Sequence, residues 1–452
     1  MGVAYAGIPR YDEALKSLQE SLDIKKRLNM KKGIAESLEM MASIQDVTGK
    51  SDLALKNYTQ ALALMRDLGD KQGTGDVLSD LGAFQLEHGK YDESLKLFKE
   101  SLQLQMDTRN ETSQGMVLSN IGNAYLSKGD FDNARTYFTQ ALEVRQKLKF
   151  PGDIADTLHN LAETSMKTGQ FDQALEQYLK ALELRRGTGD QKGAAIESSG
   201  MGAVFAFQGR YGAAVSAEQD ALKGFQESKE QGFMATEIML GYGNALALAG
   251  RSDEAARYLA DALNSAREQK SQPQVATALS YQGDNAFYRG DLNLATTLYA
   301  GALQAAAKTG DSQLVLRTKV NMAKLAVRQS KFSSALTTLR GLGEEADSLG
   351  LKYLSIVCLV LRGEAMTGMQ DYAGAQKELK SAALRSEKLG LRVLQAQAHY
   401  GLGRALELSG NKSDATAQYQ EARRAAGEVL KDAQTDAVTK RSDLAPIFAL
   451  KS

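Results

Sequence analysis

Residues 129–142 read Gly129-Asp130-Phe131-Asp132-Asn133-Ala134-Arg135-Thr136-Tyr137-Phe138-Thr139-Gln140-Ala141-Leu142. Around Ala134 there is a Gly five residues before, aromatic residues three before and four after, and Ala-Leu seven and eight after. These marks return every 40 residues, with one 41-residue step, at the anchors Ala14, Ala54, Ser94, Ala134, Ala174, Ala214, Ala255, Ala295, Ala335, Ala375 and Ala415. Periods of this size are typical of solenoids, in which each unit packs only on its neighbours.

Composition narrows the functional classes. The 452 residues carry 55 basic and 55 acidic side chains, so no global field draws the chain onto nucleic acid or an anionic membrane. The single Cys358 cannot form an internal disulfide, which fits a reducing compartment. The most apolar run, 353–361, is too short to cross a bilayer, and no signal peptide opens the chain. We therefore expect a cytoplasmic protein that binds neither membrane nor nucleic acid.

Each unit is predicted to contain two helices. In the unit 113–149, Leu118, Ile121 and Tyr125 form one apolar stripe at helical spacing, and a second stripe follows the break at Gly129. The residue twelve before each anchor is always Gly or Ala, which lets the two helices approach closely. The pattern therefore predicts stacked helical hairpins.

This combination resembles the tetratricopeptide repeat in its 40-residue form. The residues that carry the resemblance are Leu118, Ile121, Gly122, Tyr125, Ala134, Phe138 and Ala141, with their counterparts in nearly the whole chain. The repeat's frequent Trp and its Pro are absent. The resemblance implies an all-α fold, a right-handed α-solenoid (superhelix) of about eleven stacked helix-turn-helix repeats.

We predict three regions: a truncated first repeat at 1–32, ten 40-residue repeats at 33–430, and a capping helix end with a tail at 431–452. The first helix of the first repeat is short by roughly two turns, from which we expect that the chain is a fragment of a longer protein or that its start codon is misassigned. The helix from Ala425 is expected to continue to Lys440. The following tail resembles the ends of arrays in bacterial signalling proteins such as Ser/Thr kinases.

No catalytic constellation is predicted. His88, His159 and His399 lie far apart in the sequence, and Cys358 sits among apolar residues. The Gly-x-Gly pairs fall on helix-crossing positions rather than on a nucleotide-binding loop. We therefore predict a protein that is not an enzyme and that holds no cofactor or metal.

The resemblance implies that the first helix of each repeat lines a concave groove for a peptide or a partner helix. The groove positions lie 18, 15, 14, 11, 8 and 7 residues before each anchor. In the N-terminal half they are mainly acidic, with Glu36, Glu39 and Asp46 beside the predicted site residues Asp76, Asp80, Glu87, Asp156, His159 and Glu163. This surface predicts a basic partner whose affinity falls as salt rises.

Amides and aromatic rings complete the predicted groove. An Asn side chain can donate to and accept from a peptide backbone at once. The alternatives are that these Asn residues only solvate a helix face and that the aromatic residues are packing between units. The residues are Asn120, Asn123, Asn160, Asn244, Asn321, Tyr281 and Tyr288.

Two functions remain open. The favoured hypothesis is a non-catalytic protein–protein interaction scaffold that binds an extended peptide or partner helix in the concave groove. The alternative is a regulatory or sensor module of a larger bacterial signalling enzyme whose catalytic domain lies outside this chain. An uncapped first repeat would also expose an apolar face for self-association.

Overall fold

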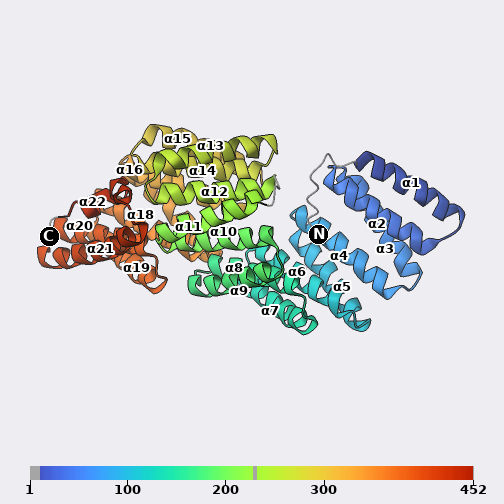
Figure 1. Cartoon of the computed structure of the whole chain (residues 1–452). Helices are drawn as coiled ribbons and strands as arrows, with labels where there is room; N and C mark the ends of the chain where they lie inside the picture. Colours follow the sequence, from blue (N-terminus) through green and yellow to red (C-terminus); the bar gives the residue numbers. More distant parts are fainter. Residues whose placement is uncertain (1–10, 228–231, 451–452) are drawn as a thin grey trace. The chain divides into compact units, whose positions relative to one another are not determined.

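The computed structural model describes residues 11–227 and 232–450, and these form 22 α-helices and one 3₁₀ helix. The all-α helical-repeat fold expected from the sequence is confirmed (Figure 1). The chain divides into two compact units, Met1–Thr164 (unit 1) and Ser165–Ser452 (unit 2), with the division inside one helix. The first helix expected for the truncated first repeat lies outside the described residues.

In the described residues, unit 1 begins with the second helix of the first repeat and continues with helix pairs. Its helices are α1 (Tyr11–Arg27), α2 (Lys31–Val47), α3 (Ser51–Asp67), α4 (Lys71–Glu87), α5 (Tyr91–Asp107), α6 (Glu111–Lys128), α7 (Phe131–Leu148) and most of α8 (Pro151–Lys167).

Unit 2 continues the pairs and ends in a short irregular tail. Its helices are α9 (Phe171–Gly187), α10 (Gln191–Phe207), α11 (Tyr211–Glu227), α12 (Phe233–Leu248), α13 (Ser252–Glu268), α14 (Gln272–Tyr288), α15 (Leu292–Ala306), α16 (Ser312–Arg328), α17 (Phe332–Ser348), α18 (Lys352–Gly368), α19 (Tyr372–Lys388), α20 (Arg392–Leu408), α21 (Lys412–Ala433), η1 (Asp436–Lys440) and α22 (Ala445–Phe448).

The turn inside each pair uses a left-handed residue. Gly129 closes α6 at φ 83°, and the Asp130 side chain then accepts a hydrogen bond from Asn133 N to start α7. The same conformation is kept where the repeat lacks Gly, at Ser330 (φ 59°) and Gln370 (φ 65°). The packing of the repeat therefore imposes a left-handed backbone on two residues that do not favour it.

Gln370→Gly is expected to raise the free energy of unfolding by about 0.5–1 kcal/mol, because Gly adopts positive φ without a steric penalty. Gln370 is exposed and its side chain makes no hydrogen bond to a described residue, so little else changes. The reciprocal control is Gly410→Gln, at φ 92° with open space around it, which should destabilise. Urea unfolding followed by circular dichroism measures both, and a loss of stability in Gln370→Gly would contradict the account.

Small residues let the two helices of a pair cross closely. A Cβ at Gly122 of α6 would lie 2.5 Å from the ring of Phe138 on α7, and Phe138 is fully buried. Gly283 and Tyr299 repeat this contact in unit 2. The glycine twelve before the anchor and the aromatic residue four after it are thus one packing element.

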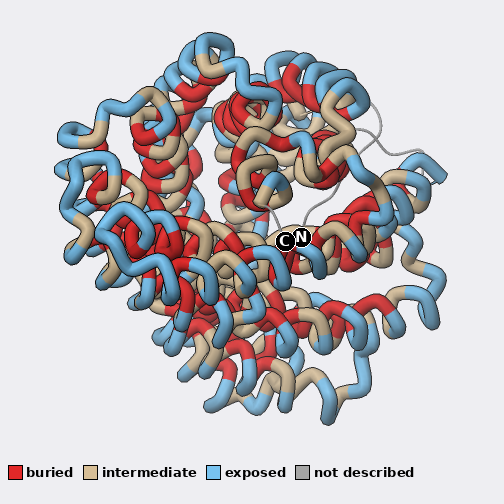
Figure 2. The backbone as a smooth tube through the Cα atoms, turned by 90° about the vertical axis from the view of Figure 1, so that its left-hand side faces the viewer, coloured by how far each residue is buried: buried red, intermediate tan, exposed pale blue. Residues whose placement is uncertain are grey.

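The first helices of successive pairs pack on one another within each unit. α4 packs on α6 in unit 1, and α10, α12, α14, α16, α18 and α20 pack in succession in unit 2. Among the described residues, the second helices of neighbouring pairs do not pack on one another to this extent. Figure 2 shows buried residues on the faces where helices meet and exposed residues at the turns.

Within unit 2 the last long helix, α21, contacts a helix from the beginning of the unit, α11. α21 packs on α11, and the Asp432 carboxylate accepts hydrogen bonds from Gly212 N (2.9 Å) and Ala213 N (3.5 Å). Those amides belong to the first turn of α11 and have no partner within the helix. Asp432 therefore caps a helix that lies 220 residues earlier in the sequence.

The expected helical continuation to Lys440 is wrong beyond Ala433. Gln434 adopts a left-handed conformation (φ 52°) that ends α21, and the Thr435 side chain then caps η1. Residues 435–450, here called the tail, turn back onto unit 2 instead of extending the array. Contacts made by Arg441, described below, hold the tail there.

Candidate functional site

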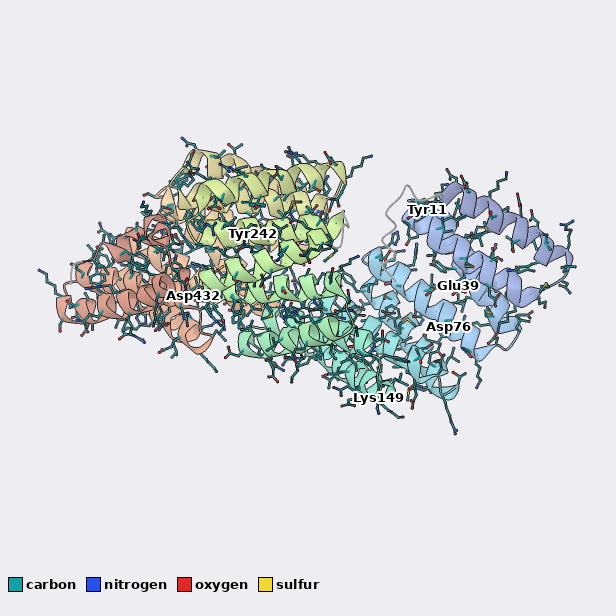
Figure 3. All side chains as sticks on the ribbon, viewed as in Figure 1. Tyr11, Glu39, Asp76, Lys149, Tyr242 and Asp432 are labelled. Atoms are coloured by element: carbon teal, nitrogen blue, oxygen red, sulfur yellow. The ribbon has the colours of Figure 1, made fainter. Side chains whose placement is uncertain are left out.

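Six carboxylates from α2 and α4 form one acidic surface in unit 1. Glu39 of α2 shares a hydrogen bond with Asp80 of α4, and Asp46 pairs in the same way with Glu87. Both pairs join residues 41 positions apart, so successive repeats present them in register. Figure 3 labels Glu39 and Asp76 on these neighbouring helices. The members of the acidic surface are Glu36, Glu39, Asp46, Asp76, Asp80 and Glu87.

Burial and mutual repulsion hold protons on this surface. Burial, followed by the charge of Asp80, raises the pKa of Glu39 to about 8. Burial also raises the pKa of Asp76, although Gln105 Nε2 donates a 2.9 Å hydrogen bond to its carboxylate. Lys32, whose charge acts on Asp76, forms an ion pair with Asp70 at 2.7 Å. The carboxylates are therefore only partly neutralised from within the chain.

His88 is a second basic group at the edge of the acidic surface. Its Nε2 lies 3.6 Å from Asp46 and 3.0 Å from Ser51 Oγ, and its ring lies 4.3 Å from that of Phe84. A protonated His88 would offset the negative charges of Asp46 and Glu87. The charges that act on Glu39 are those of Asp80, Asp76 and Glu36, so this end of the surface is acidic.

Stability should depend on pH through Glu39. Its folded pKa lies above the unfolded value, so the folded state binds more protons and loses stability as pH rises from about 4.5 to about 8. Glu39→Gln should therefore stabilise unit 1 at pH 8, by on the order of 1 kcal/mol, and have little effect at pH 4.5. Urea midpoints of both proteins at the two pH values test this, and an equal effect at both would contradict it.

The predicted asparagines have different surroundings. Asn120 Nδ2 lies 3.5 Å from Ser79 Oγ, and Asn321 Nδ2 donates to Ser280 Oγ at 3.1 Å, again across 41 residues. These two amides therefore link successive first helices. The half-buried Asn123 side chain makes no hydrogen bond to a described residue.

The predicted site residues on α8 have surroundings that differ from those of the acidic surface. Asp156 is exposed but lies in the field of Arg145, which donates to Thr157 Oγ1 at 2.6 Å. His159, Asn160 and Glu163 are half-buried on the same helix. The acidic surface is therefore made up of residues from α2 and α4.

In unit 2, the predicted aromatic residues already have cationic partners. The Arg317 guanidinium lies 5.8 Å from the Tyr281 ring, and that of Arg441, in the tail, lies 3.9 Å from the Tyr288 ring. Asn244 is half-buried on α12. Sequence reasoning missed Arg441, whose only signal was its place in a segment that departs from the repeat.

Other chemical groups are few in the described residues. Burial raises the pKa of the Cys358 thiol to about 12, so it stays protonated at neutral pH. Over 11–227 and 232–450, no three His, Cys, Asp or Glu side chains are placed to hold a metal ion. In the same residues, no helix is long and apolar enough to cross a membrane.

Two protein-family models match the repeats of this chain. Residues 106–390 match the family described as the MalT-like TPR region, and residues 360–429 match a tetratricopeptide repeat. No curated protein matches the sequence significantly.

Solved structures with a similar fold share little sequence. A Rap protein complexed with Competence and Sporulation Factor is 13% identical with a TM-score of 0.60, covering 79% of this chain and 99% of its own. BtubC from P. vanneervenii is 19% identical (TM-score 0.45; 49% and 93% covered), and yeast Tom70 is 15% identical (0.41; 94% and 100%). The likeness to the Rap protein shows the fold alone.

Proposed function

The chain belongs to the family of MalT-like TPR regions, and on this premise we propose that it is a non-catalytic protein-interaction scaffold. Its ligand is a basic peptide or partner helix. The ligand lies along the first helices of unit 1, with its cationic side chains over the acidic surface on α2 and α4. Fold alone does not define a ligand, so the proposal rests on the chemistry of that surface.

The observation that carries the proposal is the gathering of six carboxylates on α2 and α4, among which Glu39 contacts Asp80 and Asp46 contacts Glu87. A carboxylate that must stay protonated to about pH 8 is held beside other carboxylates at a cost in stability. A Lys or Arg of a partner would relieve both the repulsion and the proton retention. Strongly shifted groups gathered on one surface are typical of functional sites.

Proton linkage follows from this arrangement. A cationic ligand lowers the pKa of Glu39, so the complex holds fewer protons than the free chain at pH 6–7. Affinity for the ligand should therefore rise with pH up to about 8 and then level off. The neighbouring Asn123 amide would pair with the ligand backbone independently of its sequence.

The similar Rap structure supports the proposal at the level of the fold. That protein was crystallised in complex with Competence and Sporulation Factor, so an array of similar extent accommodates a bound factor. The acidic surface supplies the partner chemistry proposed for this chain.

The test is capture of partners from host lysate at low and moderate salt. The baits are the native chain, a triple variant Glu39→Gln, Asp76→Asn and Asp80→Asn, and a control triple variant. The control, Glu93→Gln, Asp132→Asn and Glu143→Gln, removes the same charge from exposed positions on the second helices α5 and α7.

We expect salt-sensitive capture of basic proteins by the native and control baits and its loss in the first variant. Equal capture by all three baits would contradict the acidic surface as the site. Absence of capture by any bait would contradict the scaffold function and favour a regulatory module that senses a small effector.

A further inference from the structure

The tail is seated on unit 2 by specific polar contacts. Arg441 is only 3% exposed, and its Nη1 donates a 2.7 Å hydrogen bond to the Leu248 carbonyl at the end of α12. The guanidinium carbon lies 3.9 Å from the Tyr288 ring centroid and 5.2 Å from that of Tyr211. This is the set of contacts with which proteins bind a guanidinium group: an aromatic face and a fixed acceptor.

The residue that follows Arg441 also donates hydrogen bonds to backbone carbonyls at the end of a helix. Ser442 N donates to the Tyr288 carbonyl at 2.8 Å, and its Oγ donates to the Phe287 carbonyl at 2.6 Å. Both carbonyls belong to the last turn of α14, where carbonyl groups carry partial negative charge, and the Phe287 carbonyl also accepts a 3.0 Å hydrogen bond from Gly290 N. The ends of α12 and α14 thus favour a cation and hydrogen-bond donors.

Asp443 completes a compact motif. Its two oxygens accept bonds of 3.0 and 2.8 Å from Arg441 Nε and Nη2, and Gln397 of α20 donates to it at 3.1 Å. Leu444 and Ile447 are buried in the same hydrophobic cluster as Tyr211. The receptor groups come from α11, α12, α14 and α20, whereas the ligand-like groups all come from a short Arg-x-Asp-Leu segment.

Energetics distinguish this arrangement from an ordinary cap. A buried ion pair gains little stability over apolar side chains of similar size, because both charges lose their hydration. An apolar segment would therefore cap unit 2 at least as well. A buried, hydrogen-bonded Arg–Asp pair instead supplies selectivity for one chemical motif.

We propose that unit 2 contains a second peptide-binding site, specific for an Arg-x-Asp segment, in which the tail is the resident intramolecular ligand. The site consists of the Tyr211 and Tyr288 rings, the carbonyls of Leu248, Phe287 and Tyr288, and Gln397. When the tail lifts off, an Arg-x-Asp segment of another polypeptide takes its place. This site is independent of the acidic surface of unit 1.

The first test is hydrogen exchange on the native chain. If the tail is a displaceable ligand, the Ser442 amide should exchange at least about 100-fold faster than mid-helix amides of α14 and α20, with little dependence on denaturant. Exchange of Ser442 at the rate and denaturant dependence of those helices would overturn the proposal, because the tail would then open only by unfolding.

The second test supplies the tail in trans. A fluorescent peptide of residues 435–450 is titrated into the full-length native chain and its Arg441→Ala variant, beside a peptide carrying the same substitution. The variant should bind the native-sequence peptide at least about 30-fold more tightly than the native chain does, because a tethered ligand competes at high effective concentration. The Arg441→Ala peptide should bind neither protein.

Three results would overturn the proposal: a folded variant that does not bind, equal binding of both peptides, and loss of helical circular dichroism in Arg441→Ala. The last would make the tail part of the fold itself. None of these results bears on ligand capture by unit 1, so each proposal can be contradicted without affecting the other.

Discussion

Phe138→Ala is expected to lower the free energy of unfolding by about 3–5 kcal/mol. The ring is fully buried between α6 and α7 and packs where Gly122 leaves no side chain, so its removal opens a cavity that neighbouring helices cannot fill. Because a repeat array is stabilised through contacts between neighbours, the loss should be seen for unit 1 as a whole. Urea unfolding followed by circular dichroism measures it.

The matched experiment is a double-mutant cycle with Gly122. Gly122→Ala alone should cost about 1–3 kcal/mol, since the new methyl would meet the Phe138 ring at 2.5 Å. Paired with Phe138→Leu, it should cost less than the sum of the two single changes, with a coupling of about 1 kcal/mol or more. Additive effects would show that the two positions do not form one packing element.

Glu39→Lys combined with Asp80→Lys is expected to weaken binding of a Lys/Arg-rich peptide by roughly 100-fold at low salt. The change replaces two carboxylates of the acidic surface with ammonium groups that repel the ligand. Titration calorimetry at about 50 and about 300 mM salt measures this, because the screening length differs roughly 2.5-fold between the two conditions. The difference in affinity between the native chain and the variant should become smaller as salt rises.

The control for charge reversal is Glu93→Lys with Asp132→Lys. It changes the net charge equally but places the lysines on the second helices α5 and α7. We expect affinity within a few-fold of the native chain. An equal loss in both variants would mean that overall charge, and not the acidic surface, governs binding.

The helical array could be predicted from the sequence because its contacts repeat at a fixed spacing. Gly122, Ala134 and Phe138 encode one helix crossing, and their counterparts encode the rest. The left-handed turns at Ser330 and Gln370 could not be predicted from the sequence, because neither residue is Gly. Packing of the flanking helices imposes the left-handed conformation there. The acidic residues of α2 and α4 were predicted individually, but their 41-residue pairing became visible only in three dimensions.

The tail could not be predicted because its contacts have no period. Arg441 meets Leu248 across 193 residues, and Ser442 meets Phe287 across 155. Helical preference alone favoured continuation of α21 to Lys440, whereas the structure ends it at Ala433. Likewise, composition does not change near Thr164, where the two compact units divide within α8.

The most direct test of the acidic surface as a ligand site is zero-length carbodiimide cross-linking of the chain to a captured basic partner, read out by mass spectrometry. The reagent joins a carboxylate to a lysine only where the two touch. We predict that cross-links from partner lysines map to Glu39, Asp76 and Asp80 on α2 and α4. Cross-links confined to carboxylates of the second helices, such as Glu93, Asp132 and Glu143, would contradict the account.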